Sequence, residues 1–263
     1  MHNHDIVDRL AAAELEYAHF NARRTTTGDD ETVIHLVIDD HFRCILDPTH
    51  PGSAYYNRAV CRRREALTEA QLERLPDTVA AVEVSPSLLD PDTATALLTL
   101  GFQPSQSRCY LTAPSHERAS ARPAAAIGPW QHRRADDFLD LLAIEGVAFT
   151  PEARERKRPF YCTDEFMAFV STDAHGVACA WATMYRSGSS AFLANAFTRP
   201  EYRGAGHQTA LLHARLRHAA RLGLTDVFTD VEHGSQSHRN TERVGFRTTT
   251  ITTIWTRTAR PAD

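Results

Sequence analysis

The stretch PEYRGAGHQTALL, residues 200–212, places two glycines between an arginine and a run rich in leucine. A pyrophosphate is bound well where successive backbone N–H groups converge at the N-terminus of a helix, which carries a partial positive charge. Gly204, Ala205 and Gly206 keep side chains out of such a cradle. The run 189–198 before them is patterned as a strand, and a helix is expected after them to about Leu222. This order predicts a phosphate-binding loop, whereas the alternative is a glycine turn that starts an ordinary surface helix.

Two common nucleotide-binding loops do not fit this stretch. The sequence contains no GxxxxGK[ST] motif. A dinucleotide fingerprint needs a third glycine near position 209, where Thr209 stands, and a parallel βαβ setting. The preceding segment 165–198 instead holds strand-like runs separated by the turn sequences DAHG and SGSS, which indicates an antiparallel meander.

The composition is typical of a soluble globular protein. Of its 263 residues, 42% are apolar and 24% are charged. The formal net charge of -4 argues against a general nucleic-acid binder, which is usually basic. The sequence has no apolar run long enough to cross a membrane and no N-terminal secretory signal. We therefore expect a cytoplasmic protein whose partners include neither nucleic acid nor a membrane.

The cysteines and histidines show no ligand spacing. The five cysteines are scattered and none forms a CxxC pair, and the 14 histidines contain no HExxH motif. We expect buried, reduced thiols and no metal site.

A change of composition divides the chain. The segment 113–126, APSHERASARPAAA, lacks a periodic apolar pattern and reads as a linker. Residues 1–112 and 127–263 are then two small domains. The second half is expected to form a helix near 134–149, the meander, the loop and its helix, a strand at 225–231, a helix at 235–244 and a last strand at 246–257.

The first half repeats this order less clearly. Its strands are expected at 32–38, 41–47, 55–61 and 78–84, and a helix near Leu67–Leu75. The segment 92–112 then reads as a helix, a Gly-Phe pair and a strand, like 238–256 in the second half, which indicates a weak internal duplication. No glycine separates the strand at 55–61 from the helix that follows it. The basic run 62–64 is either a weak anion site or, more simply, a solvated turn.

At this point the residues resemble a known family. FTRPEYRGAGHQTALL is similar to the central motif of the GCN5-related N-acetyltransferases (GNAT), and SQSHRNTERVGF resembles the segment that follows it there. The resemblance implies an α/β protein of the α+β type, built from two tandem GNAT-like domains. Each would be a mostly antiparallel mixed sheet flanked by helices. The first, 1–112, would be a degenerate copy without the cofactor loop, and 127–263 would be the catalytic domain.

The resemblance also implies acetyl-CoA as the cofactor. Backbone groups of Ala196, Phe197 and Thr198 would flank the pantetheine arm and the thioester. The pyrophosphate would lie on a cradle made by Arg203, Gly204, Ala205, Gly206, His207, Gln208 and Thr209. Gln208 departs from the pattern, because the family usually has glycine or alanine there. Ser237 and Asn240 would contact the far arm of the cofactor, while the alternative for this region is helix capping by Ser235 or Ser237.

The chemistry needs a base, because an acceptor amine is protonated at neutral pH. Asp230 is the first candidate, Glu232 the second and His233 the third, since they end the strand beside the expected site; for each carboxylate an ordinary surface role is the alternative. Many family members use a tyrosine as the general acid for the CoA thiolate at the position where this sequence has Thr241.

Trp181 and Tyr185 share one face of a strand and are candidates to line the acceptor pocket, or else they pack in the core. The resulting hypothesis is an acetyl-CoA-dependent N-acetyltransferase that acts by direct attack in a ternary complex. Its acceptor would be a primary amine of a small molecule such as an antibiotic, an amino acid or an amino sugar. The alternatives are a non-catalytic CoA-binding module and a protein-lysine or N-terminal acetyltransferase.

Overall fold

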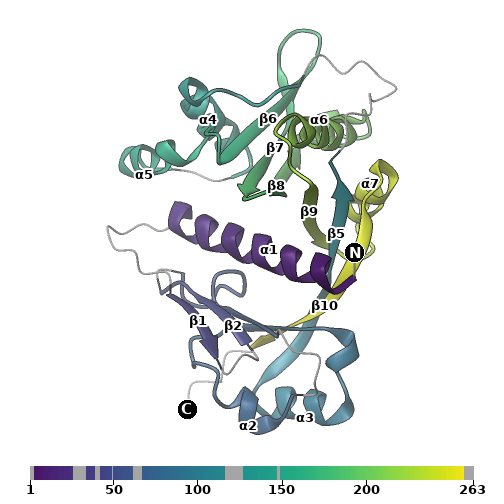
Figure 1. Ribbon diagram of the computed structural model, residues 1–263. Helices are drawn as coiled ribbons and strands as arrows, with labels where there is room; N and C mark the ends of the chain where they lie inside the picture. The colour runs from purple at the N-terminus through teal and green to yellow at the C-terminus, as the bar shows by residue number, and fades with distance from the viewer. Residues whose placement is uncertain are drawn as a thin grey trace. The chain divides into compact units, whose positions relative to one another are not determined.

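The computed structural model describes residues 3–25, 34–38, 42–48, 50–61, 67–115, 127–146 and 149–257 (Figure 1). The chain forms two compact units. Unit 1 comprises Met1–Tyr17 and Tyr110–Thr249, and unit 2 comprises Ala18–Cys109 and Thr250–Asp263. Three elements contribute residues to both units: α1 (Asn3–Thr25), β5 (Phe102–Pro114) and β10 (Arg247–Arg257).

These units differ from the predicted domains at both ends of the chain. Residues of the N-terminal helix belong to unit 1 because Tyr17 stacks on Phe192 there, with 5.1 Å between the ring centroids. The C-terminal end of β10 belongs to unit 2, where Thr253 pairs with Val84. The first residues of the predicted linker are strand, since β5 extends to Pro114, and the linker positions 116–126 lie outside the described residues.

Unit 1 is a mixed sheet whose strand order is β10-β5-β9-β8-β7-β6. The strands that lie wholly in it are β6 (Phe166–Thr172), β7 (Ala178–Ser187), β8 (Ser190–Thr198) and β9 (Asp226–Glu232). β6, β7 and β8 pair antiparallel, which confirms the predicted meander, whereas β8 and β9 pair parallel. A parallel pair needs a crossover, and the helix that follows the glycine loop provides it.

The helices of unit 1 flank this sheet. They are α4 (Ala135–Ile144), α5 (Pro151–Lys157), α6 (His207–Arg221) and α7 (Gln236–Val244), with 3-10 turns η2 (His132–Arg134), η3 (Arg158–Phe160) and η4 (Pro200–Tyr202). α6 packs on β6, β7 and β8. Leu212, Leu216 and Ala219 recur at helical spacing and are buried, so one apolar face fixes the helix against the sheet.

Unit 2 has the strand order β1-β2-β3-β4-β10-β5. Its own elements are β1 (Ile34–Ile38), β2 (Phe42–Leu46), β3 (Arg58–Cys61), α2 (Glu69–Leu72), β4 (Ala81–Val84), η1 (Pro86–Leu88) and α3 (Pro91–Thr99). Antiparallel β1–β2–β3 is followed by a parallel β3–β4 pair, a helix, a Gly-Phe pair and a strand. Unit 1 has the same order, as the predicted duplication requires. The basic run 62–64 lies outside the described residues.

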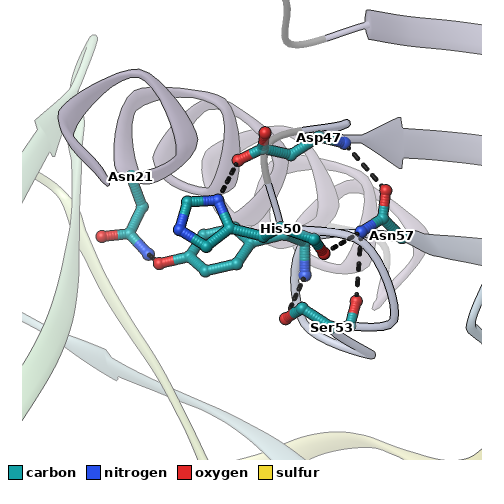
Figure 2. A network of polar contacts seen from close by, with 6 residues as sticks. Asn21, Asp47, His50, Ser53 and Asn57 are labelled. Carbon is teal, nitrogen blue, oxygen red and sulfur yellow. Dashed lines mark hydrogen bonds and ion pairs between the residues drawn. The ribbon is translucent and has the colours of Figure 1, made fainter. Parts of the chain in front are cut away.

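Side-chain hydrogen bonds hold the loop between β2 and β3 of unit 2 (Figure 2). The side chain of Asn57 accepts from the Asp47 N–H at 2.9 Å and donates to the His50 carbonyl at 2.8 Å. The buried Asp47 carboxylate lies 2.8 Å from Nδ1 of His50, and Asn21 of α1 donates to the hydroxyl of Tyr56 at 3.2 Å. This network satisfies the buried polar groups of the loop.

The five cysteines are free, and all but Cys61 are buried. Burial raises the pKa of the Cys44 and Cys162 thiols to about 12, so both stay protonated and unreactive near neutral pH. Among the described residues no helix combines the length and the apolar character that a membrane span requires.

Candidate functional site

The glycine loop lies between the end of β8 and the start of α6, as predicted. Gly204 and Gly206 have φ values of 78° and 86°, a conformation that side chains disfavour. Gly206 is the N-cap of α6 and, having no side chain, forms no capping hydrogen bond there. Residues 203–206 are exposed. The helix therefore presents an open, uncapped N-terminus that follows directly from the glycines.

This loop fits a pyrophosphate. Within the described parts of the chain, no backbone carbonyl accepts from the N–H groups of Gly204, Ala205 or Gly206. The first N–H groups of a helix also lack partners within the helix. A Cβ built on Gly204 would meet no atom within 4 Å, and the first turn of α6 carries no acidic residue that would repel an anion. The backbone N–H groups, the open space and the positive end of the helix dipole therefore lie together at the N-terminus of α6, as a bound pyrophosphate requires.

The larger side chains of the loop turn toward neighbouring elements. Nδ1 of His207 lies 2.9 Å from the hydroxyl oxygen of Ser171 on β6. Gln208 donates to the Ser237 hydroxyl at 3.1 Å and accepts a hydrogen bond from the Asn240 amide. The departure at Gln208 thus has a structural reason, because this side chain joins the N-terminus of α6 to α7.

The same contacts engage the predicted residues of α7. Ser237 and Asn240 both bond to Gln208, and their contact with the cofactor stays a prediction. Ser235 is the N-cap of α7 and accepts from the His238 N–H at 3.1 Å, so the capping alternative is confirmed for this serine.

Strands β8 and β9 separate next to the loop. Their described pairing runs from Ser190 with Asp226 to Leu193 with Thr229. On its other edge β8 pairs Ala194 with Thr183 and then Phe197 with Trp181, so two β8 residues lie opposite one β7 residue in a β-bulge. Asn195 in the bulge has a φ of 48°. Beyond Leu193 the described residues show no further pairing of β8 with β9, and we call this unpaired edge of β8, which includes Ala196 and Thr198, the opening. The backbone of Phe197 stays paired with Trp181 of β7.

The candidate bases lie on the β9 side of this opening. Asp230 directly follows the last paired residue, Thr229, and is half-buried, whereas Glu232 and His233 are exposed. His233 packs beside His238, with 5.4 Å between the ring centroids. Asp230 lies just beyond the end of the β8–β9 pairing, and its role as a base stays a prediction.

Thr241 does not fit the role of a general acid. Its side chain is 2% exposed, and its hydroxyl lies within hydrogen-bond distance of the Ser237 and His238 carbonyls, at 3.1 and 2.8 Å. A buried hydroxyl that bonds to its own helix turn does not reach a ligand.

The two predicted acceptor-pocket residues are buried. Trp181 is 0% exposed, its indole donates to Glu145, and its ring lies 5.0 Å from that of Phe197. Tyr185 is 6% exposed and donates to Glu165 at 3.4 Å. This burial agrees with the core-packing alternative, and a role in the acceptor pocket stays a prediction.

Sequence reasoning missed two residues next to the opening, Asn195 and Tyr17. Asn195 donates to the Tyr17 hydroxyl at 3.0 Å. The asparagine lies within the motif region, but one sequence does not reveal a bulge. No helix was predicted for 3–25, where α1 lies.

Unit 2 has a different arrangement at its own parallel pair. Glu83 of β4 is 1% exposed and forms ion pairs with Arg58 at 3.4 Å and Arg108 at 3.1 Å. Arg58 is likewise buried. Glu83 pairs with Val60 in the β3–β4 ladder, so these buried charges lie within the paired part of the two strands.

We compared the chain with known protein families, sequences and structures. Residues 130–246 match the model of the acetyltransferase (GNAT) family. A search of the curated protein sequences found no match. A GCN5-related N-acetyltransferase from Kribbella flavida has a similar structure, with 16% identity, a TM-score of 0.64 and coverage of 95% of this chain and 96% of that one.

Two further solved structures share the fold. A GCN5-related N-acetyltransferase from Sphaerobacter thermophilus has 14% identity and a TM-score of 0.62, over 98% of this chain and 93% of that one. A tandem GNAT protein from the clavulanic acid biosynthesis pathway has 16% identity and a TM-score of 0.50, over 84% of this chain and 79% of that one. At these identities the likeness is one of fold.

Proposed function

Because residues 130–246 form a GNAT acetyltransferase domain, we propose that this protein transfers an acetyl group from acetyl-CoA to a primary amine of a small molecule. One observation carries the proposal: an uncapped, side-chain-free helix N-terminus adjoins the point where the parallel strands β8 and β9 separate. The helix N-terminus suits the pyrophosphate of acetyl-CoA. The separation of the strands leaves backbone donors for the thioester end of the cofactor.

Each part of this site has a distinct task. When bound, acetyl-CoA would supply a thioester whose carbonyl carbon accepts the amine, so that a C–N bond forms, the C–S bond breaks and CoA leaves as a thiolate. Backbone N–H groups of 204–209 hold the pyrophosphate, and His207 and Gln208 orient the loop through Ser171 and α7. N–H groups around Ala196 to Thr198 would donate toward the thioester oxygen and would stabilise the negative charge that develops there.

Asp230 takes the proton that the ammonium group must lose before it attacks, with Glu232 and His233 as the next candidates. Attack is direct, because no cysteine of the sequence lies in a recognised nucleophile context. A small acceptor, such as an antibiotic, an amino acid or an amino sugar, suits an opening between two strands.

A second function, a CoA-binding module without catalysis, is favoured by the burial of Thr241, which removes the usual acid. Thiol release from acetyl-CoA across a library of amines separates the two. We expect at least one amine to raise thiol release above the rate of hydrolysis. If calorimetry detects CoA binding and no amine raises the rate, the module is the correct function.

The loop itself is tested by Gly206→Trp, with Gly223→Trp as its matched control. Both glycines flank α6 and have positive φ values, 86° and 71°, so both variants lose stability. Only Gly206 lies in the cradle. We expect Gly206→Trp to weaken CoA binding by more than about tenfold and Gly223→Trp by less than about twofold in calorimetry. Equal affinities of the two variants for CoA would show that the loop does not bind the cofactor.

A further inference from the structure

A chain of hydrogen bonds runs through unit 1 at the bulge of β8. The Asn195 amide donates to the Tyr17 hydroxyl at 3.0 Å and to Oγ1 of Thr183 at 3.3 Å. The Thr183 hydroxyl donates to the Ala194 carbonyl at 3.1 Å. Arg215 of α6 donates to the Thr183 carbonyl at 3.0 Å. One connected path therefore joins α1, β8, β7 and α6.

The Tyr17 end of this path is held by aromatic packing. The Tyr17 ring stacks on Phe192 at 5.1 Å and lies 5.7 Å from the Tyr185 ring. Phe192 and Tyr185 are register partners on β8 and β7. Tyr17 is 4% exposed, so packing rather than solvent sets the position of its hydroxyl. The contact with Asn195 is thus made by a side chain with little freedom.

The Arg215 end is equally fixed. Arg215 is 1% exposed and also donates from Nε to the Leu211 carbonyl at 3.2 Å. Burial lowers the pKa of Arg215 to about 9, which leaves the guanidinium charged at neutral pH. A hydrogen bond from a charged donor is stronger than a neutral one. Because α6 begins at the glycine loop, the path links the bulge to the helix that carries the loop.

Asn195 needs this support. A φ of 48° lies in the left-handed region, which is uncommon for residues with a side chain, although asparagine adopts it more readily than most. The two bonds from the Asn195 amide help to hold this conformation. If they are lost, β8 is free to straighten, and the backbone donors at Ala196 to Thr198 change direction.

We propose that Tyr17 is a positioning residue for acetyl transfer, acting through Asn195 to hold the bulge in the shape that aims its backbone donors into the opening. This inference rests on the proposed function. It assigns to the N-terminal helix a part in the chemistry that the GNAT motif region alone does not contain.

Tyr17→Phe tests the proposal because it removes one hydroxyl and keeps the stacking ring. We expect kcat to fall about tenfold, the effect of one well-placed hydrogen bond, while KM for acetyl-CoA and CoA affinity stay within about twofold. The control is Tyr161→Phe, which removes a hydroxyl from a buried ring 5.7 Å from Phe166, a neighbour of Tyr17 as well. We expect it to keep full activity.

Equal kcat values for wild type and Tyr17→Phe would overturn the proposal. A parallel loss of kcat and CoA affinity would do the same, because it indicates general distortion of the site. Asn195→Gly should lower kcat like Tyr17→Phe, and the double variant should be no slower than the slower single one.

A measurement without an acceptor separates this inference from the proposed function. Amide chemical shifts of residues 195–198 in labelled protein should move in Tyr17→Phe and stay in place in Tyr161→Phe. Unchanged shifts in Tyr17→Phe refute the positioning role even if the wild type is active. If the shifts move and the wild type acetylates no amine, the bulge contact stands and the proposed function fails.

Discussion

Thr241 stands where a general acid for the departing CoA thiolate would be expected, and its hydroxyl is not available for that role. Its hydroxyl lies 2.8 Å from the His238 carbonyl inside α7, and its side chain is buried. Thr241→Val keeps the shape and removes the hydroxyl. We expect kcat and its pH profile to stay unchanged, and the free energy of unfolding to change by no more than about 1 kcal/mol. A fall in kcat of tenfold or more, with the fold intact in circular dichroism, would restore Thr241 as a catalytic group.

His218 gives unit 1 a dependence on pH. Burial lowers the pKa of His218 below its ordinary value of 6.5, Arg221 lowers it further, and Asp164 acts in the opposite direction. The unfolded chain then binds this proton more tightly than the folded one. Stability from His218 is therefore complete above pH 6.5 and is lost as pH falls through the lower, folded-state pKa.

We predict that His218→Leu makes the stability of the protein depend less on pH below pH 6.5. Leucine keeps apolar contact with Phe169, whose ring lies 5.6 Å from that of His218, and it does not titrate. Thermal melts of both proteins between about pH 7 and pH 5 measure the difference. Parallel curves for the two proteins would show that other groups cause the acid-side loss.

At the scale of elements, Gln208 joins two helices that the sequence shows only as separate segments. It contacts Ser237 and Asn240 of α7 from the first turn of α6. We expect Gln208→Ala to lower the free energy of unfolding by about 1–2 kcal/mol, the loss of two partly buried hydrogen bonds. Urea titrations of Gln208→Ala, Asn240→Ala and the double variant measure it. Additive losses would contradict a shared contact, since residues that bond to each other are coupled.

The elements of unit 1 were largely predictable because their signals are local. Turn sequences separate β6, β7 and β8, and periodic leucines mark α6. The glycines of 204–206 were also readable, since residues with no or small side chains at a helix start imply open backbone. The bulge at Asn195 was not, because it depends on Thr183 and Tyr17, which lie 12 and 178 positions away.

At the scale of the whole chain, local patterns identified the strands but not their partners. The linker composition of 113–126 suggested a boundary, and β5 instead continues to Pro114. β10 was predicted as the last strand of the second half, yet its end pairs with β4 in unit 2. Pairing of this kind depends on residues far apart in sequence, which periodicity does not encode. The sequence showed the duplication. It did not show the exchange of ends, by which the start of the chain belongs to unit 1 and its last strand ends in unit 2.

This exchange predicts how the protein folds. α1, β5 and β10 each run through both units, so neither unit keeps all its elements when the chain is cut at the linker. A fragment 127–263 lacks Tyr17, which covers Phe166, Tyr185 and Phe192. Exposed aromatic surface of this kind destabilises a small domain and promotes aggregation. We expect the full chain to melt in one cooperative transition, and the fragment to bind a hydrophobic dye and show no sharp melt. A fragment that melts cooperatively within a few degrees of the full chain would show that the second half folds alone.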